Sequence, residues 1–144
     1  MDTKKIVNHE GRSLDLLGLE LRVLMTAQET GGAFELVHLS GGVGTGIPPH
    51  QHSQEDEVFQ ILEGRARFLI GGDSVEVGPG TVITASRNEP HGFEVLEDLK
   101  MYFWVFPANL ESMFDQLSEL GKEGAPTPEQ IGSVCDPFGI KFLH

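Results

Sequence analysis

Hydrophobic and polar residues alternate along the chain from about residue 19 to residue 106, in short runs separated by glycine-rich turns. Leu19, Leu21 and Val23, for example, share one parity. Alternation with a period of two places one set of side chains on each face of a β-strand. Strands are predicted at residues 19–27, 34–39, 57–62, 67–70, 75–77, 81–85, 91–96 and 101–106, with tight turns at 63–64 and 71–74. So many short strands predict an all-β barrel or sandwich.

The pattern changes after Pro107, where apolar residues recur at helical spacing. The apolar positions are Leu110, Met113, Phe114, Leu117 and Leu120. Asn109 is the expected N-cap of this helix, and Gly121 is expected to end it. The sequence therefore predicts an α-helix directly after the β region.

A second, shorter helix is predicted from Thr127. This residue precedes a proline and lies three residues before Gln130, the pattern of a capping box with proline at the first helical position. Cys135 belongs to its apolar face, and Pro137 is expected to end it. We therefore divide one domain into a β-barrel at residues 1–106 and a helical extension at residues 107–144, packed on the outside of the barrel.

Composition and charge narrow the classes of partner. The chain has 144 residues, enough for one domain, and a formal net charge of −12. Nucleic acids and anionic membranes both require a basic face, so neither is an expected partner. The chain has a single cysteine and contains no apolar run of 18 residues. We expect a soluble cytoplasmic protein that acts on a small molecule.

Two histidines and a glutamate are the residues most suited to chemistry. His50 and His52 lie two positions apart, so on a strand both imidazoles project from one face, about 6–7 Å apart at Cα. Glu57 shares its parity with Phe59 and Ile61, which would bury its carboxylate among apolar side chains. A buried carboxylate needs a cationic partner, and a divalent metal ion held also by two imidazoles is such a partner.

His91 is the best candidate for a fourth metal ligand. It follows Pro90 at the start of a predicted strand, on the same parity as Phe93 and Val95. His50, His52, Glu57 and His91 therefore form the candidate metal site.

The spacing of these residues resembles the cupin superfamily. The segment from Gly44 to Gly64, with its two histidines and Glu57, matches the first cupin motif without a gap, and Gly78-Pro79-Gly80 followed by Pro90-His91 resembles the second. Almost end to end, the chain is similar to small bacterial single-domain cupins that resemble quercetin dioxygenases. Gln60 and residues 86–89 depart from the common pattern without removing a ligand.

The resemblance implies a double-stranded β-helix, or jelly-roll barrel, in which these four residues hold one divalent transition metal. The metal could be Fe, Mn, Ni, Zn or Co, with one or two coordination positions left open. It implies a metal-dependent dioxygenase of a small aromatic or enolic molecule, with Glu57 as the general base. A non-redox lyase or isomerase and a non-catalytic binding protein are the alternatives. The family also implies a homodimer formed through residues 1–28.

Overall fold

The computed structural model describes residues 11–143, which form one antiparallel sheet and a small group of helices. The strands are β1 (Arg12–Leu16), β2 (Leu19–Met25), β3 (Glu35–Gly41), β4 (Gly46–His52), β5 (Asp56–Ile70), β6 (Asp73–Val77), β7 (Val82–Ala85), β8 (His91–Phe106) and β9 (Ile140–Phe142). The helices are α1 (Ala27–Thr30), α2 (Glu111–Gly121) and α3 (Pro128–Cys135), and a 3-10 turn, η1 (Asp136–Phe138), follows α3.

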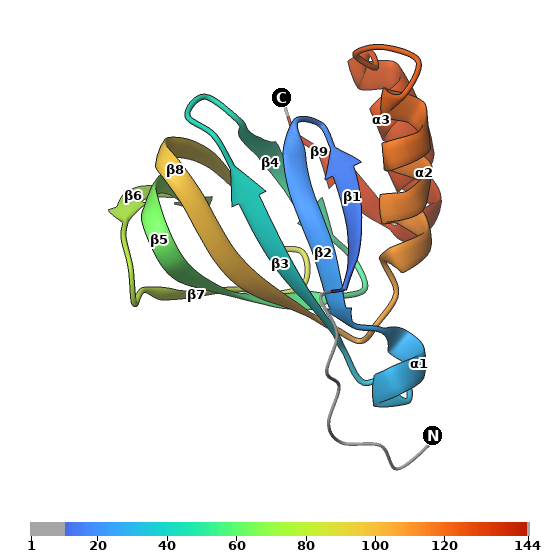
Figure 1. The fold of residues 1–144 in the computed structure, drawn as a ribbon, viewed down its shortest axis with the longest axis horizontal. Helices are drawn as coiled ribbons and strands as arrows, with labels where there is room; N and C mark the ends of the chain where they lie inside the picture. The colour runs from blue at the N-terminus through green and yellow to red at the C-terminus, as the bar shows by residue number, and fades with distance from the viewer. Residues whose placement is uncertain (1–10, 144) are drawn as a thin grey trace.

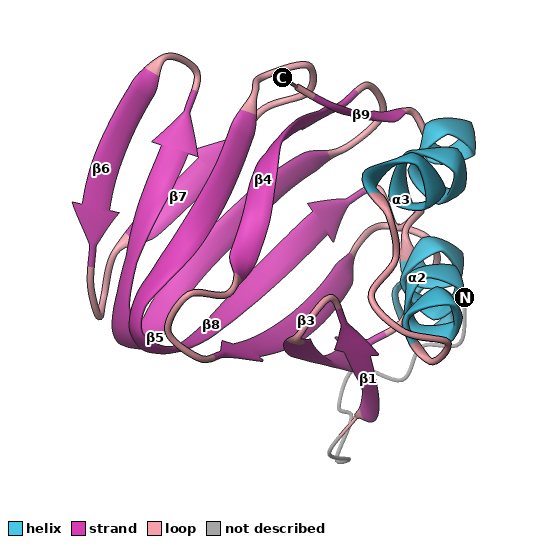
Figure 2. Ribbon diagram, turned by 90° about the horizontal axis from the view of Figure 1, so that it is seen from above, coloured by secondary structure: helices cyan, strands magenta, loops and turns pink. Residues whose placement is uncertain are grey.

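The sheet curls into a half-barrel, with α2 and α3 beside each other next to β1 and β9 (Figure 1). Its strands run in the order β1-β2-β3-β8-β4-β9, and β5 pairs with β6, β7 and β8. Seen from above, the helices stand on one side of the curled sheet, away from β6 and β7 (Figure 2). The prediction of an all-β jelly-roll barrel with C-terminal helices is confirmed.

The two longest strands each replace two predicted ones. β5 continues through Glu63 and Gly64, where the sequence predicts a turn, and that prediction is wrong. Gly64 has φ +84°, and a Cβ atom there would lie 2.0 Å from the carbonyl oxygen of Asp98. Pairing between β5 and β8 shifts register on both sides of this glycine. Gly64 therefore marks an irregularity within a long strand, where another backbone passes close by.

The barrel interior follows the predicted alternation. Glu57, Phe59 and Ile61 of β5 are buried, whereas Asp56 is exposed. On β8, His91, Phe93 and Val95 are likewise buried. The parity argument therefore placed the ligand candidates on the correct face of both strands.

α2 begins differently from the prediction. Its N-cap is Leu110, which makes no side-chain cap, and Asn109 instead donates to Glu55. The carboxylate of Glu35, from β3, accepts hydrogen bonds from the backbone N–H groups of Leu110 and Glu111 at 3.0 and 2.9 Å. A residue 75 positions away thus satisfies the first N–H groups of the helix.

α3 begins as predicted, and its capping box at Thr127 and Gln130 is confirmed. β2 ends at Met25, two residues before its predicted end, because Thr26 and Glu29 form another capping box that starts α1. None of the helices in the described part of the chain has the length and hydrophobicity needed to span a lipid bilayer.

Candidate metal centre

The structure brings all four predicted site residues together inside the barrel. His50 and His52 come from β4, Glu57 from β5 and His91 from β8. Each offers one ligand atom, and these atoms all lie within 4.8 Å of one another. The β4–β8 pairing sets His50 directly opposite His91, and β5, which carries Glu57, pairs with β8. Strand pairing therefore brings the three strands of the cluster together.

Backbone carbonyls hold two of the imidazole rings. Nδ1 of His50 lies 2.9 Å from the carbonyl oxygen of Pro48, and Nδ1 of His91 lies 3.1 Å from that of Glu89. An Nδ1–H that donates to a carbonyl leaves Nε2 free to act as a ligand. For His91, Nε2 is 3.0 Å from Oε1 of Glu57. These contacts orient the Nε2 atoms toward the centre of the cluster.

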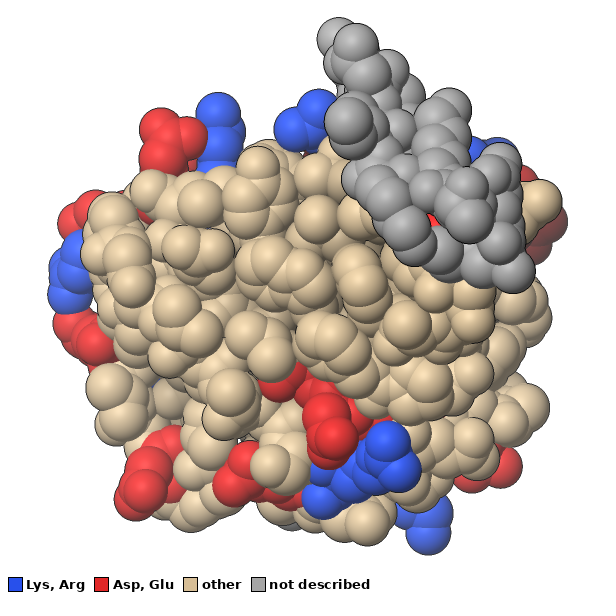
Figure 3. All heavy atoms as spheres, turned by 90° about the horizontal axis from the view of Figure 1, so that it is seen from below, with Lys and Arg blue, Asp and Glu red and all other residues tan. Residues whose placement is uncertain are grey.

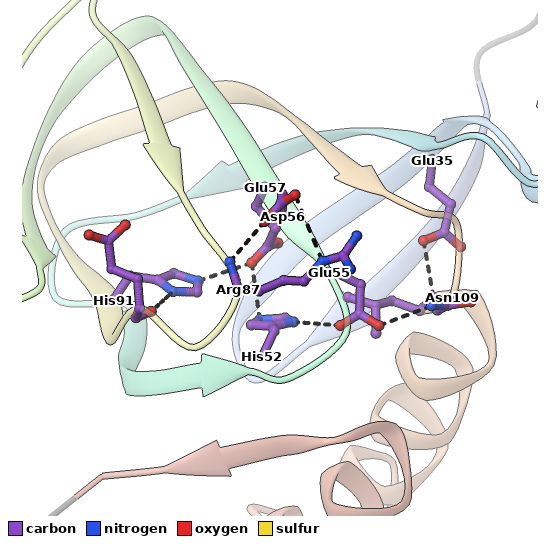
Figure 4. Close-up of polar contacts among 10 residues, drawn as sticks. Glu35, His52, Glu55, Asp56, Glu57, Arg87, His91 and Asn109 are labelled. Carbon is purple, nitrogen blue, oxygen red and sulfur yellow. Dashed lines mark hydrogen bonds and ion pairs between the residues drawn. The ribbon is translucent and has the colours of Figure 1, made fainter.

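A second carboxylate holds the third ring. Nδ1 of His52 lies 3.0 Å from Oε1 of Glu55, whose other oxygen accepts a hydrogen bond from Nδ2 of Asn109 at 3.1 Å (Figure 4). Glu55 is 1% exposed. A carboxylate behind a ligating histidine fixes its tautomer and orientation and makes the ring a stronger donor. The sequence analysis missed Glu55, although its position three residues after His52 was a usable signal.

Burial and mutual charge determine the protonation of the cluster. Burial, together with its histidine neighbours, lowers the pKa of His50 to about 4. Burial also lowers the pKa of His52, but the negative charges of Glu57 and Glu55 outweigh it and raise that pKa to about 9. Burial raises the pKa of Glu57, but His52 and His91 outweigh it and hold this pKa well below its usual range. An anionic carboxylate is thus favoured among imidazoles.

The donor set fits a divalent transition metal. Nε2 of His52 is buried and makes no hydrogen bond of good geometry, although it lies 3.0 Å from Oε1 of Glu57. A buried nitrogen without a hydrogen bond is costly, and coordination to an ion would satisfy it. Three imidazoles and one carboxylate suit Fe(II), Mn(II), Ni(II), Zn(II) and Co(II) alike. The cluster could therefore hold a metal ion, but these residue types do not select which one.

The neighbouring acid has a different role. The exposed carboxylate of Asp56 points away from the cluster and accepts a hydrogen bond from the backbone N–H of Arg87 at 2.8 Å (Figure 4). This contact ties the loop before β8 to β5. Of the three consecutive acids, Glu55 and Glu57 therefore contact the histidines of the cluster, whereas Asp56 contacts the loop before β8 at the surface.

The cluster lies in the wall of a cavity of about 80 Å³ that is otherwise apolar. Leu19 and Leu21 of β2 line it, as do Phe103 and Phe59, and the ring of Phe59 lies 6.0 Å from that of His91. Met113, Phe114 and Leu117 from α2 and Cys135 from α3 also line it. The predicted helical extension therefore contributes directly to the space in front of the cluster.

Comparison with known proteins supports the interpretation of the four-residue cluster as a candidate metal site. The cupin domain family matches residues 37–106, a range that contains all four cluster residues. Quercetin 2,3-dioxygenase of Bacillus subtilis (strain 168) is 28% identical over 129 residues, which cover 88% of this chain and 36% of the relative. The chain thus spans about a third of the length of this curated relative.

Solved structures share the fold. KdgF from Halomonas sp. superposes with a TM-score of 0.65 at 21% identity, over 76% of this chain and 97% of the other. A predicted oxalate decarboxylase from Thermotoga maritima gives 0.62 at 20% identity, over 71% and 99%. The nucleoside dehydratase Pac13 of Streptomyces gives 0.63 at 19% identity, over 76% and 88%. The names of these neighbours span several chemistries, so at this identity they inform the fold alone. The match to residues 37–106 and the similarity to the Bacillus enzyme together support a cupin superfamily member that resembles quercetin dioxygenase.

Proposed function

We propose that the protein is a metal-dependent dioxygenase of a small aromatic or enolic molecule, with His50, His52, Glu57 and His91 as the metal ligands. The observation that carries the proposal is the position of this buried cluster in the wall of an apolar cavity. The similarity to a quercetin 2,3-dioxygenase supports the choice of reaction. An apolar, water-poor site also protects reactive oxygen chemistry from side reactions.

The metal and two glutamates have distinct roles in the proposed reaction. The metal, when bound, supplies Lewis acidity and a place for dioxygen and substrate to meet. Glu57 is the only carboxylate among the described residues that line the cavity. We assign it the general base, because it is the acceptor available for the proton of an enol or phenol. Glu55 acts behind His52 and positions that ring.

Oxygen consumption tests the proposal. Purified protein loaded separately with Fe(II), Mn(II), Ni(II) or Co(II) is given β-diketones and flavonols in an oxygen-electrode cell. We expect substrate-dependent uptake with at least one metal, and its loss in His91→Ala. Absence of uptake with every metal would contradict a dioxygenase. Turnover that continues unchanged under nitrogen would instead support the non-redox lyase or isomerase, and ligand binding without turnover would support a binding protein.

We also propose that the protein is a homodimer. Two chains of net charge −12 repel each other, so a contact requires a face with few charges. Uncharged side chains form a broad continuous area on one face, with most charged side chains toward its edges (Figure 3). The family resemblance implies a contact through residues 1–28, of which the first ten lie outside the described residues. Light scattering should give twice the chain mass, and a value near 15.7 kDa would contradict the dimer.

A further inference from the structure

The cavity in front of the metal cluster is polar at one end only. Apart from the four cluster residues, every side chain that lines it within residues 11–143 is apolar or is the thiol of Cys135. The thiol is 1% exposed, and burial raises its pKa to about 11, so it stays neutral. Within the described part of the chain, the far end of the cavity therefore offers no cation, hydroxyl or amide to a ligand.

This lining discriminates strongly among ligands. A polar group that enters an apolar wall loses its water and finds no hydrogen-bond partner there. A charged group loses more, because no opposite charge lies within reach. An alkyl or aryl group gains from the same wall, since its own apolar surface leaves water. The apolar walls therefore favour a ligand whose far end is a hydrocarbon group and disfavour one whose far end is polar or charged.

The size of the cavity adds a second restriction. Its volume is about 80 Å³, whereas an engineered apolar cavity of roughly 150 Å³ holds one benzene molecule. Any ligand larger than a few carbon atoms requires its walls to yield. Met113 lies on α2 in this wall, and its unbranched thioether adapts more readily than the surrounding rings.

We propose that the substrate is a compact molecule with a single metal-binding head, such as an enol or a diketone, and an uncharged hydrocarbon tail. This inference rests on the proposed metal site but not on the proposed reaction with oxygen. It excludes carboxylated, phosphorylated and sugar-bearing substrates, whose second polar group would face Met113, Phe114 and Leu117. It also disfavours a polyhydroxylated three-ring flavonol.

A series of hydroxamic acids tests the preference for a hydrocarbon tail, because the metal-binding hydroxamate group is the same in every compound. Binding of three probes to zinc-loaded protein is measured by calorimetry under nitrogen: acetohydroxamic acid, butanohydroxamic acid and succinic monohydroxamic acid. The last two differ only by a terminal methyl or carboxylate. We expect the butano compound to bind at least tenfold more tightly than acetohydroxamic acid, and the succinic compound no more tightly than acetohydroxamic acid. A succinic compound that binds as tightly as the butano compound would overturn the proposal.

A matched pair of methionine variants locates the tail. Met113→Gln places an amide in the wall, whereas Met25→Gln makes the same change on β2 outside the cavity. We expect the tenfold advantage of the butano tail to shrink at least threefold in Met113→Gln and to persist in Met25→Gln. Equal effects of both variants would contradict the assigned wall.

A metal-free measurement separates this inference from the metal site. Xenon binds apolar cavities without any polar contact. In protein labelled at the methionine methyl groups, xenon should shift the signals of Met101 and Met113, which line the cavity, and leave Met25 unchanged. Unshifted Met101 and Met113 signals would overturn the apolar site. A positive result with no oxygen uptake would keep the substrate class and reject only the dioxygenase.

Discussion

Glu57 and Glu35 are both buried glutamates inside the same barrel, but they sit in opposite surroundings. Glu57 lies 3.0 Å from Nε2 of both His52 and His91, and these imidazoles lower its pKa despite burial. Glu35 is 0% exposed and accepts two backbone N–H groups from the start of α2. Burial raises the pKa of Glu35 to about 7, and the two hydrogen bonds only partly offset it.

The difference shows how partners decide the role of a buried acid. The partners of Glu35 are fixed backbone groups, which no ligand can replace without unwinding the first turn of α2. The partners of Glu57 are side-chain nitrogens, whose protons a metal ion can replace. The region around Glu35 therefore joins the helix to the sheet, whereas the region around Glu57 is available to a ligand. Substitutions at the two glutamates should separate these two roles.

Removal of the Glu57 charge should have the largest effect, on metal binding. In Glu57→Gln the cluster loses its anionic donor, so zinc affinity should fall more than 100-fold, while the metal-free protein still folds and unfolds cooperatively. Calorimetric titration and thermal unfolding measure the two quantities. Glu63→Gln, an exposed glutamate on the same strand, is the control. Full zinc affinity in Glu57→Gln would contradict the assigned ligand.

Removal of Glu35 should lower the stability of the fold and leave zinc affinity largely unchanged. Glu35→Ala leaves two N–H groups of α2 without acceptors and opens space in the core, so the free energy of unfolding should fall by about 3 kcal/mol. Zinc affinity of the folded fraction should stay within a few-fold of the wild type. Urea unfolding and zinc titration test this. A variant that unfolds normally but loses zinc would reverse the comparison.

The pH dependence of stability should carry the signature of Glu35. Its pKa is about 7 in the folded protein, against an ordinary value of 4.5, so the folded state binds this proton more tightly. The stabilisation is fully present below about pH 4.5 and is lost as pH rises through about 7, by at most roughly 3 kcal/mol. Unfolding free energies of wild type and Glu35→Gln, compared across this range, isolate the effect. Parallel curves would contradict it.

A smaller effect is expected at Glu55, which lies between the two regions. Glu55→Gln weakens the support of the His52 ring, so zinc affinity should fall about 10-fold, at the low end for such supporting groups. Asp56→Asn, an exposed neighbour that contacts Arg87 instead, should leave zinc affinity unchanged. Equal zinc affinities in the two variants would contradict the assigned role of Glu55 in positioning His52.

The sequence predicted the residues that face the interior better than it predicted how the helices and strands are joined. Parity placed Glu57 and His91 inside because side-chain alternation is a local property of a strand. The sequence did not reveal that β5 is continuous, because a glycine between two apolar runs is typical of a turn. The reason for Gly64 is the backbone of Asp98, which is distant in the sequence and passes close to it. The N-terminus of α2 was misassigned for a related reason, since its acceptor, Glu35, lies far away in the chain.

Glu55 was missed for a different reason. Three consecutive acids resemble a solvated surface run, and alternation alone cannot assign a residue that precedes the strand. Only the folded chain brings Asn109 to its second oxygen. Long-range partners of this kind, rather than local propensity, were the part that the sequence did not reveal.

The family match spans residues 37–106 and encloses every candidate ligand, but much of the cavity wall lies on either side of it, from Leu16 to Leu21 and from Leu110 to Phe142. Substitutions in these flanks can therefore change which molecules enter the barrel and leave the strands of the candidate metal site unchanged. Two cupins with the same four ligand residues can in this way bind unrelated substrates. For this chain, specificity is best sought at its two ends rather than in its motif.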